Sequence, residues 1–140
     1  MDVMNPLAEN VLFPHSGTFS ANPITLTAGL ESMKLFDATA IERINTLAQR
    51  AIDGIERAIK ETGATACVTG AGSMFRIHMK EHAPKNFREA YMSPEENAKL
   101  KILLDHMFDE NFLMINTCSA VLSTPMTESE IDELVEAVKR

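Results

Sequence analysis

Residues 39–80 read TAIERINTLAQRAIDGIERAIKETGATACVTGAGSMFRIHMK, and the spacing of their apolar side chains changes once along the way. Up to residue 63, the apolar residues recur every three or four positions, as on one face of a helix. They are Ile41, Ile44, Leu47, Ala48, Ala51, Ile52, Ile55 and Ile59. From Thr65 onward, apolar and polar residues alternate, which is typical of a strand. The stretch therefore predicts a long amphipathic helix followed by two short strands.

Local signals predict where this helix begins and ends. Thr39 and Glu42 have the spacing of a capping box, which predicts the N-terminus, and Gly63 is placed to end the helix. Gly54 lies inside it and should weaken it by about 1 kcal/mol relative to alanine. The apolar stripe is long enough to absorb that loss.

The Gly70-Ala71-Gly72 segment predicts a turn between two strands over 66–69 and 73–79, which would pair as an antiparallel hairpin. Alternation places Arg76 and His78 on one face, where they could contact a carboxylate. Because polar residues on an open sheet face are usually solvated, we expect both side chains to lie in solvent.

The remaining elements are predicted from caps and short apolar runs. Asn22-Pro23 and Ser93-Pro94 each combine an N-cap residue with a proline at the first helical position, and Thr127 with Glu130 forms a capping box. The predicted elements are a helix over 23–36, a surface loop over 81–92, a helix from 94 to about 108, strands over 112–115 and 120–123, and a helix after Thr127.

Paired strands separated by helices indicate an α+β fold, with an antiparallel sheet of about three or four strands and helices packed on one face. The chain has 140 residues and is 45% hydrophobic, enough for one compact domain. Residues before Pro23 fit this domain poorly and resemble a strap from another domain.

Composition and charge disfavour several classes of function. The net charge of -7 comes without any basic run that could follow a nucleic-acid backbone, and no stretch has the length and apolarity to cross a bilayer. Cys67 and Cys118 stand alone, and the histidines have no partner at metal-ligand spacing, so we expect neither a metal site nor a disulfide framework. A cytoplasmic location fits this cysteine usage, and Cys118 is expected to be inert.

Residues 15–23, HSGTFSANP, place glycine, hydroxyl groups and a helix N-terminus within nine positions. Backbone N–H groups, hydroxyl donors and the helix dipole together suit a phosphate dianion. The alternative is that serine, threonine and asparagine only cap the helix and complete a turn. The residues alone leave both interpretations open.

Four segments in order resemble the class III pyridoxal-phosphate-dependent aminotransferases, most closely the glutamate-1-semialdehyde aminomutase branch. They are GTFSANP (17–23), VTGAGSMF (68–75), NFREA (86–90) and TESEID (127–132). The resemblance implies the small C-terminal domain of a fold-type I transferase. Residues 1–22 would be a strap from the end of the large cofactor-binding domain, including the phosphate-contacting loop, and residues 23–140 the crossing helix and the small domain.

The resemblance also implies a role for two residues in a homodimer. Thr18 corresponds to the family threonine that reaches across the dimer to the phosphate of the partner's pyridoxal phosphate, with Gly17 contributing its backbone. The family lysine that forms the Schiff base, the carboxylate on the pyridinium nitrogen and the aromatic residue on the ring all precede the matched segment, and no lysine occurs before Lys34. We therefore expect no catalytic residues here, and an enzyme fragment that needs its large domain to act on a small amino-acid substrate.

Two alternatives remain from the sequence. Where aminomutases carry a proline- and aromatic-containing loop with a glutamate, residues 114–121 read MINTCSAV, which suits a transaminase for a β-amino acid or another small amino donor at least as well. Asn116 and Thr117 are the predicted pocket-rim residues of that loop. A rival from another class is a stand-alone association or vestigial anion-binding module without catalysis, whose exposed Leu26, Leu30 and Met33 would drive self-association.

Overall fold

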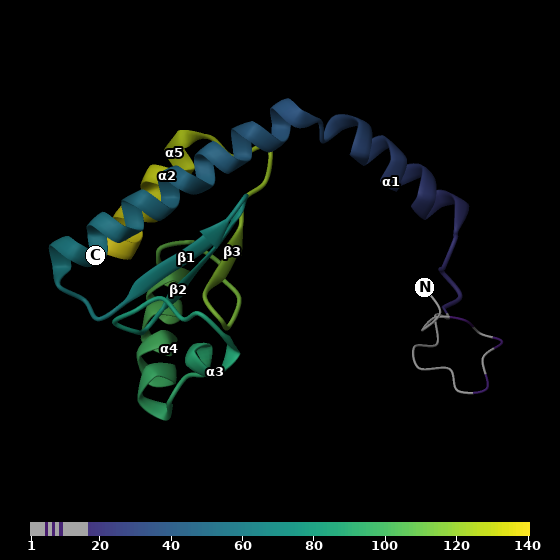
Figure 1. Cartoon of the computed structure of the whole chain (residues 1–140). Coiled ribbons are helices and arrows are strands. Elements are labelled where there is room, and N and C mark those ends of the chain that lie inside the picture. Colours follow the sequence, from purple (N-terminus) through teal and green to yellow (C-terminus); the bar gives the residue numbers. More distant parts are fainter. Residues whose placement is uncertain (1–4, 6, 8, 10–16) are drawn as a thin grey trace. The chain divides into compact units, whose positions relative to one another are not determined.

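A computed structural model describes residues 5, 7, 9 and 17–140 (Figure 1). The chain divides into two compact units, Met1–Asp37 and Ala38–Arg140. His15 and Ser16 of the predicted phosphate segment, with most of the predicted strap, lie outside the described residues.

The first unit contains helix α1, Pro23–Leu35. As predicted, Asn22 is the N-cap and Pro23 the first helical residue: Asn22 Oδ1 accepts hydrogen bonds from the backbone N–H groups of Ile24 (2.9 Å) and Thr25 (3.3 Å). No residue of α1 is buried. Its cap, not packing within the unit, fixes where the helix begins.

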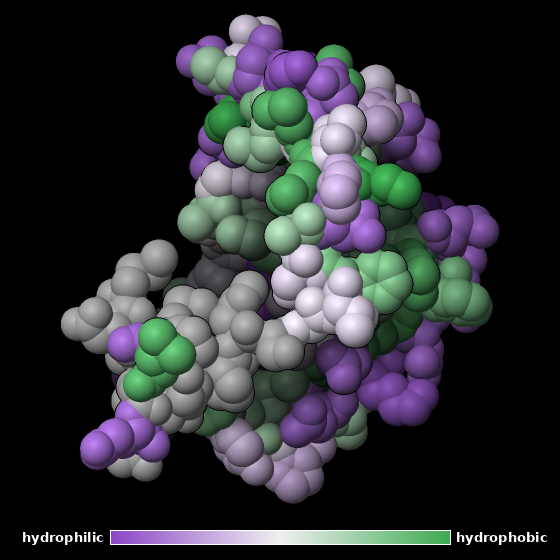
Figure 2. Space-filling view, turned by 90° about the vertical axis from the view of Figure 1, so that its right-hand side faces the viewer, coloured by the Kyte–Doolittle hydropathy of each residue, from purple (hydrophilic) through white to green (hydrophobic). Residues whose placement is uncertain are grey.

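Apolar side chains of α1 are exposed along its whole length. Figure 2 shows apolar side chains (green) at the surface beside hydrophilic ones (purple). The exposed large apolar residues of α1 are Ile24, Leu26, Leu30, Met33 and Leu35.

The second unit begins with helix α2, Ala38–Thr62. Its buried stripe consists of Ile44, Leu47, Ala48, Ala51, Gly54, Ile55 and Ala58. The helix starts one residue before Thr39, so the prediction of Thr39 as N-cap was wrong. Gly63 ends the helix as predicted, with a φ of 69° and an N–H that donates to the Ile59 carbonyl at 3.0 Å.

Strands β1, Cys67–Ala71, and β2, Met74–His78, form the predicted antiparallel hairpin. Its turn lies at Gly72-Ser73, where Gly72 has a φ of 58°. The turn was predicted over residues 70–72 but lies further along the chain, because Gly70 belongs to β1. A Cβ on Gly70 would lie 2.5 Å from Ile52 Cδ1 of α2. This glycine serves close packing of the hairpin on α2 and not the turn.

Strand β3, Ser119–Val121, pairs antiparallel with β2 and completes a three-stranded sheet in the order β1-β2-β3. The predicted strand over 112–115 was wrong. These residues follow helix α4, Pro94–Asp109, and the Phe112 N–H donates back to the Met107 carbonyl at 2.8 Å. With Asn111 at a φ of 69°, this segment closes the helix C-terminus and is not available for strand pairing.

Each of the other helices begins at a residue that caps its N-terminus. The predicted loop over 81–92 contains a short helix, α3, Phe87–Ala90, which begins where Asn86 accepts a hydrogen bond from the Glu89 N–H at 3.1 Å. The predicted caps Ser93 and Thr127 are confirmed, each in a capping box: Ser93 with Glu96 opens α4, and Thr127 with Glu130 opens α5, Glu128–Lys139.

The core of the second unit lies between the helices and one face of the sheet. Helices α2 and α5 run side by side along that face (Figure 1). The buried core residues include Leu47, Ile55, Val68, Phe75, Ile77, Leu100, Met107, Ile131 and Leu134. This arrangement confirms the α+β prediction. None of the helices within the described residues is both long and apolar enough to span a bilayer.

Candidate functional site

The predicted phosphate residues lie in an exposed turn just before α1. The Ser20 N–H donates to the Gly17 carbonyl at 3.0 Å, and the Asn22 N–H donates to the Phe19 carbonyl at 3.2 Å. Thr18 lies within this turn, is exposed, and makes no hydrogen bond within the described part of the chain. Its hydroxyl and N–H are therefore available to a ligand.

Fewer hydrogen-bond donors are free for a phosphate at this turn than the sequence suggests. Asn22 Oδ1 already occupies the N–H groups of Ile24 and Thr25 at the start of α1. An anion here would be held by Thr18 and the backbone of Gly17, while the helix would contribute mainly its dipole. A Cβ on Gly17 would lie 3.2 Å from Ser20 Oγ, so glycine suits this tight turn.

The predicted pocket-rim residues, Asn116 and Thr117, belong to the second unit, whereas Gly17 and Thr18 belong to the first. Asn116 is exposed and Thr117 is half-buried. Thr117 Oγ1 lies 3.0 Å from Ser119 Oγ, and the Thr117 carbonyl accepts a hydrogen bond from Arg76 Nε at 3.1 Å. This loop is thus tied to the sheet through its backbone.

Cys118 is buried in the core, and burial raises the pKa of its thiol to about 11. Its carbonyl accepts a hydrogen bond from the Ile77 N–H at 3.1 Å. Because the thiolate is the reactive form, Cys118 is chemically quiet at neutral pH. Burial also raises the pKa of Cys67, and neither cysteine forms a disulfide.

His78 was expected in solvent, and that prediction was wrong: the residue is only 5% exposed. Its Nε2 lies 2.8 Å from Thr69 Oγ1. Burial, and then the charges of Arg76 and Lys80, lower the pKa of its imidazole, which favours the neutral ring. Lys80 is paired with Glu96 of α4 at 2.8 Å. The His78–Thr69 pair was missed because strand alternation gives the face of a side chain but not what covers it.

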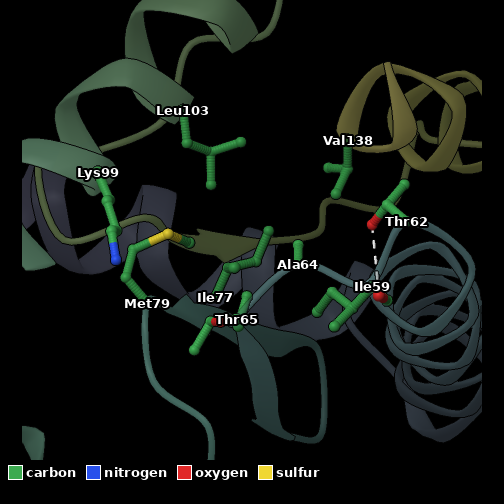
Figure 3. A pocket seen from close by; sticks show the side chains of 10 residues that line it. Ile59, Thr62, Ala64, Thr65, Ile77, Met79, Lys99, Leu103 and Val138 are labelled. Atoms are coloured by element: carbon green, nitrogen blue, oxygen red, sulfur yellow. Dashed lines mark hydrogen bonds between the residues drawn. The ribbon is translucent and has the colours of Figure 1, made fainter.

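Two of the cavities that open on the second unit have mostly apolar linings. The first, of about 290 Å³, is shown in Figure 3, where side chains from α2, β2, α4 and α5 surround a common space. Its lining includes Ile59, Ile77, Met79, Lys99, Leu103 and Val138. Lys99 is the charged residue of this lining, and its ammonium group pairs with Glu95 at 2.8 Å.

The second cavity, of about 370 Å³, lies between residues 112–115, β3 and α5 and is mostly apolar. Among residues 17–140, no three His, Cys, Asp or Glu side chains gather in a way that could hold a metal ion.

Comparison with known proteins relates nearly the whole chain to aminomutases and transaminases. No protein-family model matches the sequence. The chain is 30% identical to the glutamate-1-semialdehyde 2,1-aminomutase of Akkermansia muciniphila over 142 residues, which cover 99% of this chain and 32% of that protein.

Solved structures agree with the sequence comparison. An omega-transaminase from Sphaerobacter thermophilus matches 98% of the chain with a TM-score of 0.85 and 31% identity, over 31% of its own length. A transaminase with PLP bound matches 98% of the chain, over 31% of its own length, with a TM-score of 0.76 and 31% identity. A beta-phenylalanine aminotransferase from Variovorax paradoxus matches 99% of the chain, over 32% of its own length, with a TM-score of 0.73 and 25% identity. The chain corresponds to the C-terminal portion of a class III pyridoxal-phosphate-dependent aminotransferase.

This aminotransferase portion spans about a third of the length of the curated relatives it matches. The sequence-based recognition and fold class are confirmed by these matches. The loop over residues 114–121 had suggested that transaminases would resemble the chain as well as aminomutases do, and relatives of both kinds are found.

Proposed function

We propose that the chain forms part of a pyridoxal-phosphate-dependent enzyme that transfers an amino group, an aminotransferase or aminomutase, and that it is not catalytic alone. The observation that carries this proposal is the match of 98% of the chain to about a third of a transaminase, at a TM-score of 0.85. We assign residues 1–22 to a strap from the large cofactor-binding domain and residues 23–140 to the crossing helix and small domain.

In this proposal, Gly17 and Thr18 hold the phosphate of pyridoxal phosphate bound to a partner subunit. The exposed Thr18 hydroxyl and N–H supply two donors, and donors to a phosphate form strong, charge-assisted hydrogen bonds. When bound, the cofactor serves as an electron sink, and the protein supplies orientation and electrostatics. The lysine that carries the cofactor would belong to the large domain.

The remaining parts of the chain have supporting roles in the proposed enzyme. Asn116 and Thr117 would line the rim of a pocket for a small amino-acid substrate. The exposed apolar residues of α1 support a homodimer or contact with the large domain, because a helix with no buried residue gains little stability alone. The unpaired cysteines support a cytoplasmic location.

The test for Thr18 uses a chimera in which this chain replaces the matching third of the Akkermansia muciniphila aminomutase. We expect Thr18→Val to raise the cofactor dissociation constant by about 10-fold or more, because a hydrogen bond to a charged group contributes about 1.5–3 kcal/mol. Titration with pyridoxal phosphate, followed by visible absorbance, measures this constant.

Thr27→Val is the matched control, since Thr27 lies on α1 and is also exposed. It should leave cofactor affinity unchanged. Equal affinities in the parent chimera and the Thr18→Val variant would refute the role of Thr18 while leaving the aminotransferase relationship intact.

The rival function, a stand-alone association or anion-binding module, is favoured by one observation: the large apolar side chains of α1 are 56–81% exposed. In either case the isolated chain should self-associate. We expect sedimentation of the purified chain to show dimers or larger species, and Leu26→Glu with Leu30→Glu to shift it toward monomers. A monodisperse monomer at all concentrations would argue against both the homodimer and the association module.

A further inference from the structure

We propose that the outer face of the sheet, opposite the face along which α2 and α5 run, binds a small carboxylate with a short apolar chain, held by Arg76 between Thr69 and Ser119. The proposal goes beyond the aminotransferase assignment and does not rest on it. The three residues lie on β1, β2 and β3 of the second unit.

Strand register brings the three polar side chains into one row. Arg76 of β2 pairs directly with Thr69 of β1 on one side and with Ser119 of β3 on the other. Directly opposite residues in antiparallel strands carry their side chains on the same face, with Cβ atoms about 4.5–5.5 Å apart. A guanidinium group is thus flanked by two hydroxyl groups.

Arg76 is half-buried, and its charge has no acidic partner within residues 17–140. Its Nε donates to the Thr117 carbonyl at 3.1 Å, which anchors one edge of the guanidinium plane. The two terminal nitrogens retain their hydrogens for another acceptor. A partly desolvated guanidinium favours a counter-anion, and its planar fork matches a carboxylate in a bidentate pair.

The flanking hydroxyls are held by their own partners. Thr69 Oγ1 lies 2.8 Å from His78 Nε2, and Ser119 Oγ lies 3.0 Å from Thr117 Oγ1. Both residues are half-buried, and these contacts position their hydroxyl groups at the edges of the row.

The next row on the same face is apolar. Met74 pairs directly with Val121, and both side chains are more than half exposed, at 54% and 64%. A carboxylate bound at Arg76 could therefore lay a short alkyl chain across Met74 and Val121. The side chains of Met74 and Val121 therefore favour a carboxylate with an apolar chain over an inorganic anion.

His78 provides a reporter for this site that does not depend on enzyme activity. The groups around its imidazole are Thr69 and Cys67 on β1, Arg76 on β2, Lys80 just after β2, and Glu96 of α4, which pairs with Lys80. The positive charge of Arg76 helps to lower the pKa of His78. A carboxylate that neutralises this charge should raise that pKa, and by linkage it should bind more tightly as His78 becomes protonated.

The test is an NMR titration of the full chain with pentanoate, following the His78 ring and the Thr69 methyl group. We expect saturable shifts and a raised His78 pKa at saturation. Acetate should bind at least about threefold more weakly, since it lacks the alkyl chain. Pentylammonium, the cationic counterpart, should give no saturable shift.

Arg76→Gln should weaken pentanoate binding at least tenfold and raise the His78 pKa without any ligand. Arg76→Lys keeps the positive charge but removes the planar fork of the guanidinium group, and it should bind pentanoate at least threefold more weakly. It tests the same site if the glutamine variant folds poorly. The matched control is Arg88→Gln on α3, an exposed arginine outside the sheet, which should bind pentanoate like the wild-type chain.

No saturable shift in the wild-type chain, or unchanged pentanoate affinity in Arg76→Gln and Arg76→Lys, would overturn the proposal. If the apparent affinity for pentanoate falls as the chain concentration rises, an acidic side chain of a second copy occupies the row and competes with pentanoate, and the small-molecule proposal is wrong. An affinity independent of chain concentration supports the small-molecule ligand.

Discussion

Replacing Gly54 with alanine should destabilise the second unit by about 2 kcal/mol, although alanine is the better helix former by about 1 kcal/mol. A Cβ on Gly54 would lie 2.5 Å from Val135 Cγ2 and 3.0 Å from Val135 Cγ1. Those atoms belong to α5, which packs along α2 at this position. The added methyl group would push the two helices apart and loosen the core between them.

The clash at Gly54 involves one side chain, so a second substitution should relieve it. In urea denaturation, the double variant Gly54→Ala, Val135→Ala should fall within about 1 kcal/mol of Val135→Ala alone, a coupling that a double-mutant cycle measures directly. Gly29→Ala on α1 is the matched control, because a Cβ there meets nothing within 4 Å. If Gly54→Ala were as stable as the parent chain, the close approach of α5 to α2 would be wrong.

Helices whose ends carry their own signals were predicted from sequence. Pro23, Ser93 and Thr127 mark the starts of α1, α4 and α5, because a cap depends on residues within four positions of one another. For Gly54, the sequence predicted only that this residue weakens α2. Its actual role depends on Val135, 81 positions away, and no local rule contains that contact.

Features set by tertiary contacts were missed for the same reason. The apolar run over 112–115 has the composition of a strand, but the hydrogen bond from Phe112 to the Met107 carbonyl turns it into a helix ending. His78 was assigned to the correct face of β2, yet its burial and its contact with Thr69 of β1 depend on tertiary packing. Gly17 and Thr18 were identified through resemblance to a family, since an exposed turn before a helix does not by itself indicate a ligand.

Replacing Gly70 with alanine should cause a larger loss of stability and destabilise the second unit by at least about 3 kcal/mol. That loss is at or beyond the upper end of the range for ordinary overpacking. A Cβ there would lie 2.5 Å from Ile52 Cδ1, 2.6 Å from the Met74 carbonyl oxygen and 3.3 Å from Phe75 Cα. Two of these three atoms are backbone atoms of the paired strand. They cannot move away without breaking the hairpin register that aligns Thr69 with Arg76.

The contrast between the two glycines makes this expectation specific. Ile52→Ala removes the side-chain part of the clash at Gly70 but leaves the Met74 carbonyl oxygen in place, so the double variant Gly70→Ala, Ile52→Ala should show little recovery in urea denaturation. The same design at Gly54 should show recovery, because only a side chain is in the way there. Recovery at Gly70 would mean that the hairpin can shift on α2, and the fixed row of Thr69, Arg76 and Ser119 would then lose the rigid support that a binding site requires.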